Sequence, residues 1–143
     1  MKINYQLRQP DFARDIRRMS DDFHKELKGE VVAATRQVSL NAKSFAPVDK
    51  GGLRSSIRVA NKGLSGEVSV GVEYGPYQEY GTGTKVKVPS ELKSYAMQFK
   101  GKGIREVNTR AQPYLYPAFF IQRDKFIKAL DRMFDRVKNK HWK

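Results

Sequence analysis

The sequence predicts an α+β fold, with a long N-terminal helix, a small antiparallel sheet built from a central β-hairpin, and a C-terminal helix packed on that sheet. Two long stretches, 12–45 and 117–139, repeat apolar residues at steps of three and four, which is the spacing of one helix face. Two short stretches, near 57–59 and 68–72, alternate apolar and other residues, which is typical of half-buried strands. Helices flanking such a hairpin can cover one face of its sheet, so the predicted class is α+β.

The length of 143 residues is that of one domain, and we expect a single domain over 1–143. Its expected segments, in order, are a long helix (12–45), a turn-rich centre with the hairpin (46–82), a variable loop or insertion (83–111), a C-terminal helix (117–139) and a basic tail (140–143). The longest apolar run is far too short to cross a bilayer.

The first helix is the clearest element. Its apolar face comprises Phe12, Ile16, Met19, Phe23, Leu27, Val31, Ala34, Val38, Ala42 and Phe45. Asp11 is placed to cap the first turn, because a carboxylate accepts hydrogen bonds from the unpaired amides there, and Pro47 ends the run. At 1.5 Å per residue this helix is about 50 Å long, more than a compact domain needs. We therefore expect either a bend at Gly29 or one end that projects to meet something else.

The centre of the chain is rich in turn residues. Asp49 and the following Lys-Gly-Gly indicate a turn, or the cap of a single helical turn through Leu53 and Arg54. The alternating residues after it predict a hairpin, and the Asn, Gly and Ser residues at 60–67 indicate a somewhat long connection between its strands. Leu53 and Ile57 are expected to lie under the sheet.

Three further local elements follow the hairpin. Tyrosines spaced three apart, with Pro76 before them and Gly81 after, predict a helical turn. Residues 89–99 predict a short helix capped by Ser90, and 104–107 a possible short strand within an exposed loop. The segment 112–117 forms an extended bridge, and Pro117 falls in the first turn of the last helix.

The composition favours an acidic partner without choosing one. Lys and Arg number 28 against 15 Asp and Glu, a formal net charge of +13, and such a field attracts nucleic acid, anionic lipid or an acidic protein face. Cysteine is absent, which suits a reducing compartment and removes disulfides and thiolate sites. The N-terminus has no pattern of a secretory signal, so we expect a cytoplasmic protein.

Motifs of catalysis and metal binding are missing. The two histidines, His24 and His141, are far apart and belong to no zinc-binding pattern. Neither a nucleophile elbow nor a phosphate-binding glycine loop occurs. Glu73, Glu79 and Asp49 could form an acid–base or Mg²⁺ group, but three scattered acids are common in any domain. We therefore expect no catalytic residues, no metal and no cofactor.

A stand-alone nucleic-acid-binding protein remains an alternative. Basic side chains that could contact phosphates occur at Arg14, Arg17, Arg18, Arg132, Arg136, Lys140 and in the loop 100–110. The tyrosines of the helical turn could stack on bases. Against this, the hairpin lacks the aromatic and basic signature of an RNA-binding sheet, and no helix-turn-helix spacing is present.

Three sequence blocks resemble the tail-completion (head–tail joining, minor tail component) family of long-tailed bacteriophages and prophages. The matching residues are Ala46, Pro47, Val48, Asp49, Gly51, Leu53, Arg54, Ser56 and Ile57 in the first block, Tyr74, Tyr77, Glu79, Tyr80, Gly81 and Thr82 in the second, and Pro113, Leu115, Pro117 and Ala118 in the third. The departures are Lys50, Gly75 and Tyr114, where Thr or Ser, Ala, and Phe are usual. The blocks occur in the family's order, with the hairpin between the first two.

The resemblance implies a non-enzymatic virion component at the phage neck, assembled in the host cytoplasm. It implies a ring, expected to be a hexamer, that joins the head connector to the tail tube or its terminator. A ring around a DNA passage would also explain the +13 charge, because a basic lumen suits a polyanion in transit. Partners would then be other copies of the chain, the connector and tube proteins, and DNA contacted without sequence preference.

We assign two roles to individual residues on this basis. A scaffold role is expected for Pro47, Asp49, Gly51, Leu53, Arg54, Tyr74, Tyr77, Glu79, Tyr80, Gly81, Thr82, Pro113 and Pro117, with Arg54 paired to Glu79 because their charges are opposite. Contact with partners or DNA is expected at Lys62, Lys85, Lys87, Lys100, Lys102, Arg105 and Arg110, in or near the hairpin tip (61–66) and the loop 83–110.

Overall fold

The computed structural model describes residues 9–48, 51–83, 86–99 and 109–142. Its elements are α1 (Gln9–Phe45), α2 (Gly52–Ser56), β1 (Ile57–Lys62), β2 (Ser65–Val70), α3 (Gly75–Tyr80), α4 (Lys93–Ala96) and α5 (Leu115–His141), with 3-10 turns at Ser90–Leu92 and Met97–Phe99. The predicted α+β fold, with two long helices and a hairpin, is confirmed.

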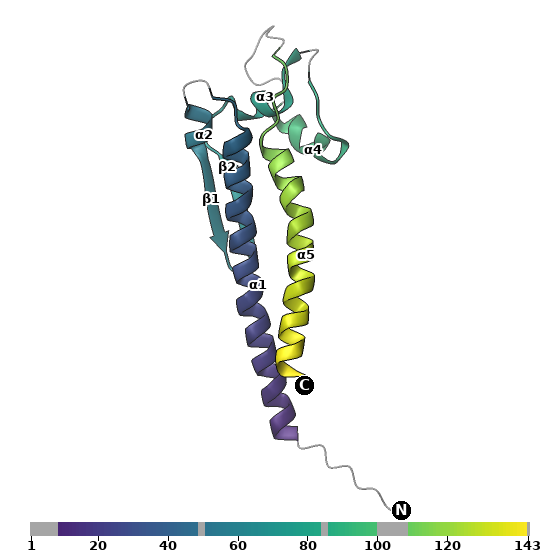
Figure 1. The fold of residues 1–143 in the computed structure, drawn as a ribbon. Helices are drawn as coiled ribbons and strands as arrows, with labels where there is room; N and C mark the ends of the chain where they lie inside the picture. Colours follow the sequence, from purple (N-terminus) through teal and green to yellow (C-terminus); the bar gives the residue numbers. More distant parts are fainter. Residues whose placement is uncertain (1–8, 49–50, 84–85, 100–108, 143) are drawn as a thin grey trace, which may run out of the picture.

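The two long helices run side by side in opposite directions and form a stalk (Figure 1). Helix α1 has 37 residues and α5 has 27, and the N-terminal end of α1 extends past the end of α5. The helix is one unbroken element through Gly29, so the projecting end, rather than a bend, accounts for its length. Helix α1 begins at Gln9, so Asp11 lies inside the first turn. The prediction that Asp11 is the capping residue before the helix is therefore wrong.

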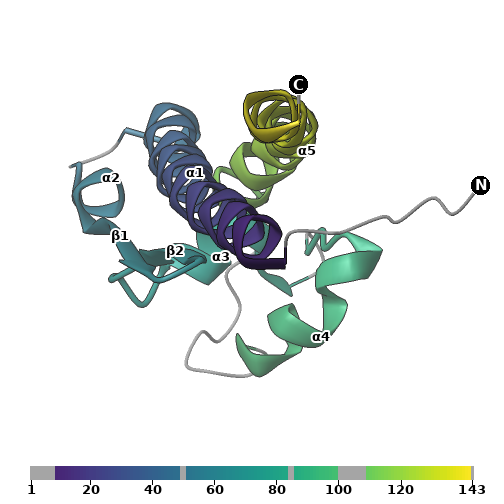
Figure 2. The ribbon, with the colours of Figure 1, turned by 90° about the horizontal axis from the view of Figure 1, so that it is seen from below.

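The hairpin packs on α1 and leaves α5 on another side of the same helix (Figure 2). Its strands pair antiparallel from Ile57 opposite Val70 to Lys62 opposite Ser65. Only two residues connect them, and Gly63 supplies the positive φ of 59° that a tight turn of this kind requires. The long connection predicted over 60–67 is therefore wrong, because polar residues at the exposed ends of both strands resemble a loop.

Gly66 lies where β2 approaches α1 most closely. A Cβ atom at this position would stand 1.8 Å from Thr35 Oγ1 and 2.9 Å from Thr35 Cβ. No real side chain fits in that space, so the absence of one allows the strand backbone to rest on the helix. This contact fixes the height of the hairpin along α1.

The core lies at the upper end of the molecule, where α1, the hairpin and α5 meet. Its buried residues are Val38, Ala42, Ala46, Leu53, Ile57, Tyr114 and Ala118. Ala42 and Ala118 are fully buried, and such small side chains let the two long helices approach closely. The prediction that Leu53 and Ile57 pack beneath the sheet is confirmed.

The short elements agree with the sequence in part. Helix α3 contains Pro76 in its first turn and ends at Tyr80, and Gly81 follows with a positive φ of 77°, a backbone conformation that favours glycine. Residues 90–99 are helical, but Ser90 is the first helical residue and Pro89 occupies the cap position, so that cap is wrong. The helical turn through Leu53 and Arg54 is confirmed, with Gly51 in the position before it. Asp49 and the strand predicted at 104–107 lie outside the described residues.

Candidate interaction surface

A buried carboxylate joins the second and third sequence blocks. Glu79 on α3 is 3% exposed, and it accepts hydrogen bonds from the backbone N–H groups of Tyr114 (2.8 Å), Leu115 (2.9 Å) and Tyr116 (2.7 Å). These are the unpaired amides at the start of α5, where the helix dipole also favours a negative charge. Glu79 therefore caps the C-terminal helix from a different part of the chain.

Further bonds hold the same two blocks together. The Gln112 N–H donates to the Gln78 carbonyl, and the two glutamine side chains bond to each other at 2.8 Å. The Thr82 N–H donates to the Thr109 carbonyl, while the Thr109 N–H donates to Thr82 Oγ1. The segment after α3 is thus paired with the segment that leads into α5, which makes this end of the molecule a connected framework.

The predicted pairing of Arg54 with Glu79 is wrong. Both carboxylate oxygens of Glu79 are occupied by backbone amides, and Arg54 Nη2 instead donates to the Ala46 carbonyl at 3.4 Å. That bond ties α2 to the end of α1. Arg54 Nε is buried and has no hydrogen-bond partner among the described residues.

Two buried tyrosines stand beside Glu79. Burial, followed by the nearby negative charge of Glu79, raises the pKa of Tyr80 to about 12. The same two causes, in the same order, raise the pKa of Tyr114 above its ordinary value. Both hydroxyl groups therefore stay protonated through the physiological range.

An open groove of about 750 Å³ lies beside this framework, between β2, α1, α4 and α5. Apolar side chains form most of its lining, among them Val31, Val38, Val68, Leu115, Phe119 and Phe126. Strand β2 and the turn before it supply one wall, whereas no residue of β1 takes part. Phe119 is 51% exposed, so part of this apolar lining is open to solvent.

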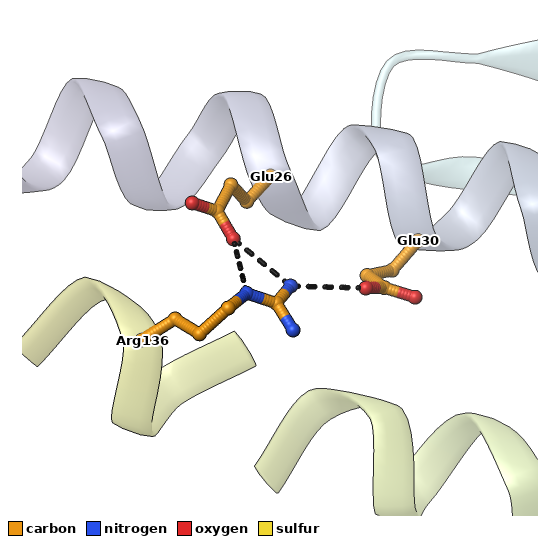
Figure 3. Close-up of polar contacts among 3 residues, drawn as sticks. All are labelled: Glu26, Glu30 and Arg136. Atoms are coloured by element: carbon orange, nitrogen blue, oxygen red, sulfur yellow. Dashed lines mark hydrogen bonds and ion pairs between the residues drawn. The ribbon is translucent and has the colours of Figure 1, made fainter. Parts of the chain in front are cut away.

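Ion pairs hold the lower part of the stalk. Arg136 on α5 donates to Glu26 at 3.1 Å and to Glu30 at 3.3 Å on α1 (Figure 3), and these bonds, Glu26 first, raise the pKa of Arg136. Below them, Asp22 accepts from Lys140 and lies 2.9 Å from His141 Nε2. Its pKa is lowered mainly by the Lys140 bond and then by His141. These ion pairs join α5 to α1 in the part of the stalk where Met133 and Val137 are also buried.

The predicted partner-facing residues lie around the molecule rather than in one cluster. Lys62 is at the exposed end of the hairpin, and Lys87 and Arg110 are exposed elsewhere in the upper part. Lys85, Lys100, Lys102 and Arg105 lie outside the described residues. Of the basic helix residues, Arg17, Arg18, Lys25 and Lys28 are exposed on α1.

Within the described ranges, no three His, Cys, Asp or Glu residues come together as a possible metal site. Glu73 is exposed, whereas Glu79 is buried and occupied by backbone amides, so these two acids do not form a catalytic pair. Over the same ranges, the helices include none that is both long enough and apolar enough to span a membrane.

A family model described as "Bacteriophage HK97-gp10, putative tail-component" matches residues 11–81, about half of the chain. The matched segment runs from the first turn of α1 through α3 and includes the first two sequence blocks. The chain belongs to this HK97-gp10-like family, and a phage tail component is a structural protein of the virion. Searches of curated proteins and of solved structures gave no match.

Sequence reasoning missed the capping role of Glu79 and the groove. One signal for the cap was present: α5 begins after Pro113 and Tyr114, with no Ser, Thr, Asp or Asn to bond its first amides. An acceptor had to come from elsewhere in the chain. The groove had no comparable signal, because its walls come from elements spread along the chain: α1, β2, α3, α4 and α5.

Proposed function

We propose that the protein completes the tail and joins it to the head at the neck of a long-tailed phage or prophage. Copies of the chain would form a ring, with six subunits expected, between the head connector and the tail tube or its terminator. The observation that carries this proposal is the family match over 11–81, which identifies a tail component. The order of the three sequence blocks supports the more specific position at the neck.

The arrangement of the motif residues supports a structural rather than an enzymatic role. Glu79, the one buried acid of the second block, is fully engaged in capping α5. The tyrosines beside it are held in their neutral form. We therefore propose that the framework maintains the shape of the subunit, and that its exposed surfaces make the contacts of assembly.

The basic surface gives a reason for contact with DNA in the ring. Lys62, Lys87 and Arg110 are exposed, and a lumen that carries such residues would favour passage of DNA. We propose that this contact is weak and independent of base sequence. Assembly would take place in the host cytoplasm, and the mature location would be the virion neck.

Co-expression with connector and tail-tube proteins from the same source tests the proposal. We expect rings in negative-stain images, together with weak binding to duplex DNA. A monomer or dimer that never joins these proteins, but retards DNA with a steep salt dependence, would instead support the stand-alone nucleic-acid-binding protein. Divalent-dependent cleavage of DNA by the pure protein would contradict both.

A further inference from the structure

We propose that the groove beside β2 receives residues 1–8 of a neighbouring copy of this chain, which add to β2 as a third strand. This inference deepens the proposed function and rests on it for the oligomer.

The outer edge of β2 offers backbone groups to a further strand. In an antiparallel pair, every second residue directs its N–H and C=O groups away from its partner strand. The Gly71 N–H donates to the Ser56 carbonyl, which places Ser65, Glu67 and Ser69 in the hydrogen-bonded pairs with β1. Gly66 and Val68 therefore direct their N–H and C=O groups outward. Both residues line the groove, so these groups face its open space.

The groove is suited to a strand that is apolar on one side. The side chain of Val68 faces α1, whereas Glu67 is exposed on the opposite face of the sheet. A strand paired with β2 would therefore direct alternate side chains onto the apolar floor formed by α1 and α5, and the others toward solvent. Val31, Phe119 and Phe126 belong to that floor.

Residues 1–8 have this pattern. Met1, Ile3, Tyr5 and Leu7 are apolar, and they alternate strictly with Lys2, Asn4, Gln6 and Arg8. Strict alternation is the signature of a strand with one buried face. The polar set is basic, so Lys2 or Arg8 would lie on the same face as Glu67, where opposite charges on neighbouring strands stabilise the pairing.

The same chain cannot fill its own groove in this way. Gly66 rests on Thr35, which lies about 39 Å along α1 from Gln9 at 1.5 Å per residue. Eight extended residues span at most about 29 Å. The strand must therefore come from a second copy. If each copy passes its strand to the next in one direction, the exchange is a head-to-tail contact, which generates a ring when the rotation closes.

Disulfide trapping tests the contact directly, because the chain contains no cysteine. A tagged Asn4→Cys chain is mixed with an untagged Glu67→Cys chain under oxidising conditions, with Lys2→Cys and Gln6→Cys used to scan the register. The matched control is Ala60→Cys, because Ala60 pairs with Glu67 on the same face but lies one strand farther away. Adjacent strands are about 4.8 Å apart, so only the Glu67 position falls within disulfide range of an added strand. We expect at least tenfold more cross-linked heterodimer with Glu67→Cys than with Ala60→Cys. Equal yields with these two variants, whichever cysteine in residues 1–8 is used, would overturn the proposal.

A pair of double variants tests the side-chain pattern. Ile3→Asp with Tyr5→Asp places charges on the groove side, whereas Asn4→Asp with Gln6→Asp makes the same change of charge on the solvent side. We expect self-association, measured by sedimentation equilibrium, to weaken at least tenfold in the first variant and less than twofold in the second. If the two double variants weaken self-association equally and Phe12→Asp abolishes it, the groove would be assigned to the projecting end of α1 and the proposal would be overturned.

These outcomes separate the inference from the proposed function. Rings that form with the connector and tube proteins despite Ile3→Asp and Tyr5→Asp would overturn the strand exchange and leave the neck role intact. Heterodimers trapped at Glu67 in a protein that is absent from virions would support the exchange and contradict the neck role.

Discussion

Replacing Glu79 with alanine should remove the cap of α5 and destabilise the whole chain. The carboxylate accepts three hydrogen bonds of 2.7–2.9 Å from the amides of Tyr114, Leu115 and Tyr116. Alanine provides no acceptor, and the start of α5 has no local capping side chain to take over. The three amides would be left without partners next to a fully buried Tyr114.

The expected loss follows from those three donors. A buried donor left unsatisfied costs about 1–3 kcal/mol, and three independent donors would give about 3–9 kcal/mol. Leu115 and Tyr116 are only partly buried, so water can reach their amides and the lower half of this range applies. We expect the free energy of unfolding to fall by about 3–5 kcal/mol in Glu79→Ala.

Glu79→Gln should cost less than alanine. One oxygen accepts from both Tyr114 and Leu115, so an amide oxygen in that position keeps two of the three bonds. The side-chain NH₂ then faces the Tyr116 N–H, and because both groups are donors, no hydrogen bond forms between them. We expect a loss of about 1–3 kcal/mol for that one unsatisfied amide.

Urea unfolding followed by circular dichroism measures these changes, provided that the m-value stays constant. Glu73→Ala is the matched control, because Glu73 is an exposed glutamate just before α3 and should change stability by less than about 0.5 kcal/mol. Hydrogen exchange should accelerate at the amides of the first turn of α5. If Glu79→Ala stays within 0.5 kcal/mol of the parent chain, the capping argument is refuted.

Three further predictions concern other parts of the fold. Because the pKa of Tyr80 is raised to about 12, this tyrosine ionises in the unfolded chain at a lower pH than in the folded one. The free energy of unfolding should therefore fall by up to about 1.4 kcal/mol per pH unit between pH 10 and 12. Tyr80→Phe should remove this contribution in melts recorded over a series of pH values, and an unchanged slope would contradict the prediction. Gly66→Ala should lower the free energy of unfolding, measured in urea, by about 1–3 kcal/mol, because the new Cβ collides with Thr35. Gly29→Ala should raise it by about 0.5–1 kcal/mol, because no atom lies within 4 Å of a Cβ there. If both variants change stability in the same direction, the close approach at Gly66 is refuted. Arg136→Ala should lower the melting temperature slightly at low salt and less at high salt, because salt screens its half-exposed ion pairs. A change that does not depend on salt would indicate lost packing instead of lost ion pairs.

Much of the fold was predictable because local patterns determine it. The spacing of apolar residues located both long helices, and Pro76 and Gly81 marked the two ends of α3. The hairpin was predicted but its length was not. Asn61, Lys62 and Ser65 are exposed at the strand ends, so no burial pattern distinguishes them from a loop.

The long-range parts of the site were not predictable from a single sequence. Glu79 bonds to amides 35 to 37 residues away, and no residue type or spacing specifies that pairing. Opposite charge suggested Arg54 instead, but a helix start with three unpaired amides provides more hydrogen bonds to a buried carboxylate than one guanidinium group. The groove likewise depends on how β2 and α5 are placed around α1.

The position of the chain in the virion is the most direct test of its proposed role. Cryo-electron microscopy of phage particles from the source strain, with peptides of the chain identified by mass spectrometry, would locate it. The proposal predicts a ring at the head–tail junction whose subunits fit the paired α1 and α5 helices with the hairpin beside them. Complete, infectious particles that lack the chain, or a location away from the neck, would contradict it.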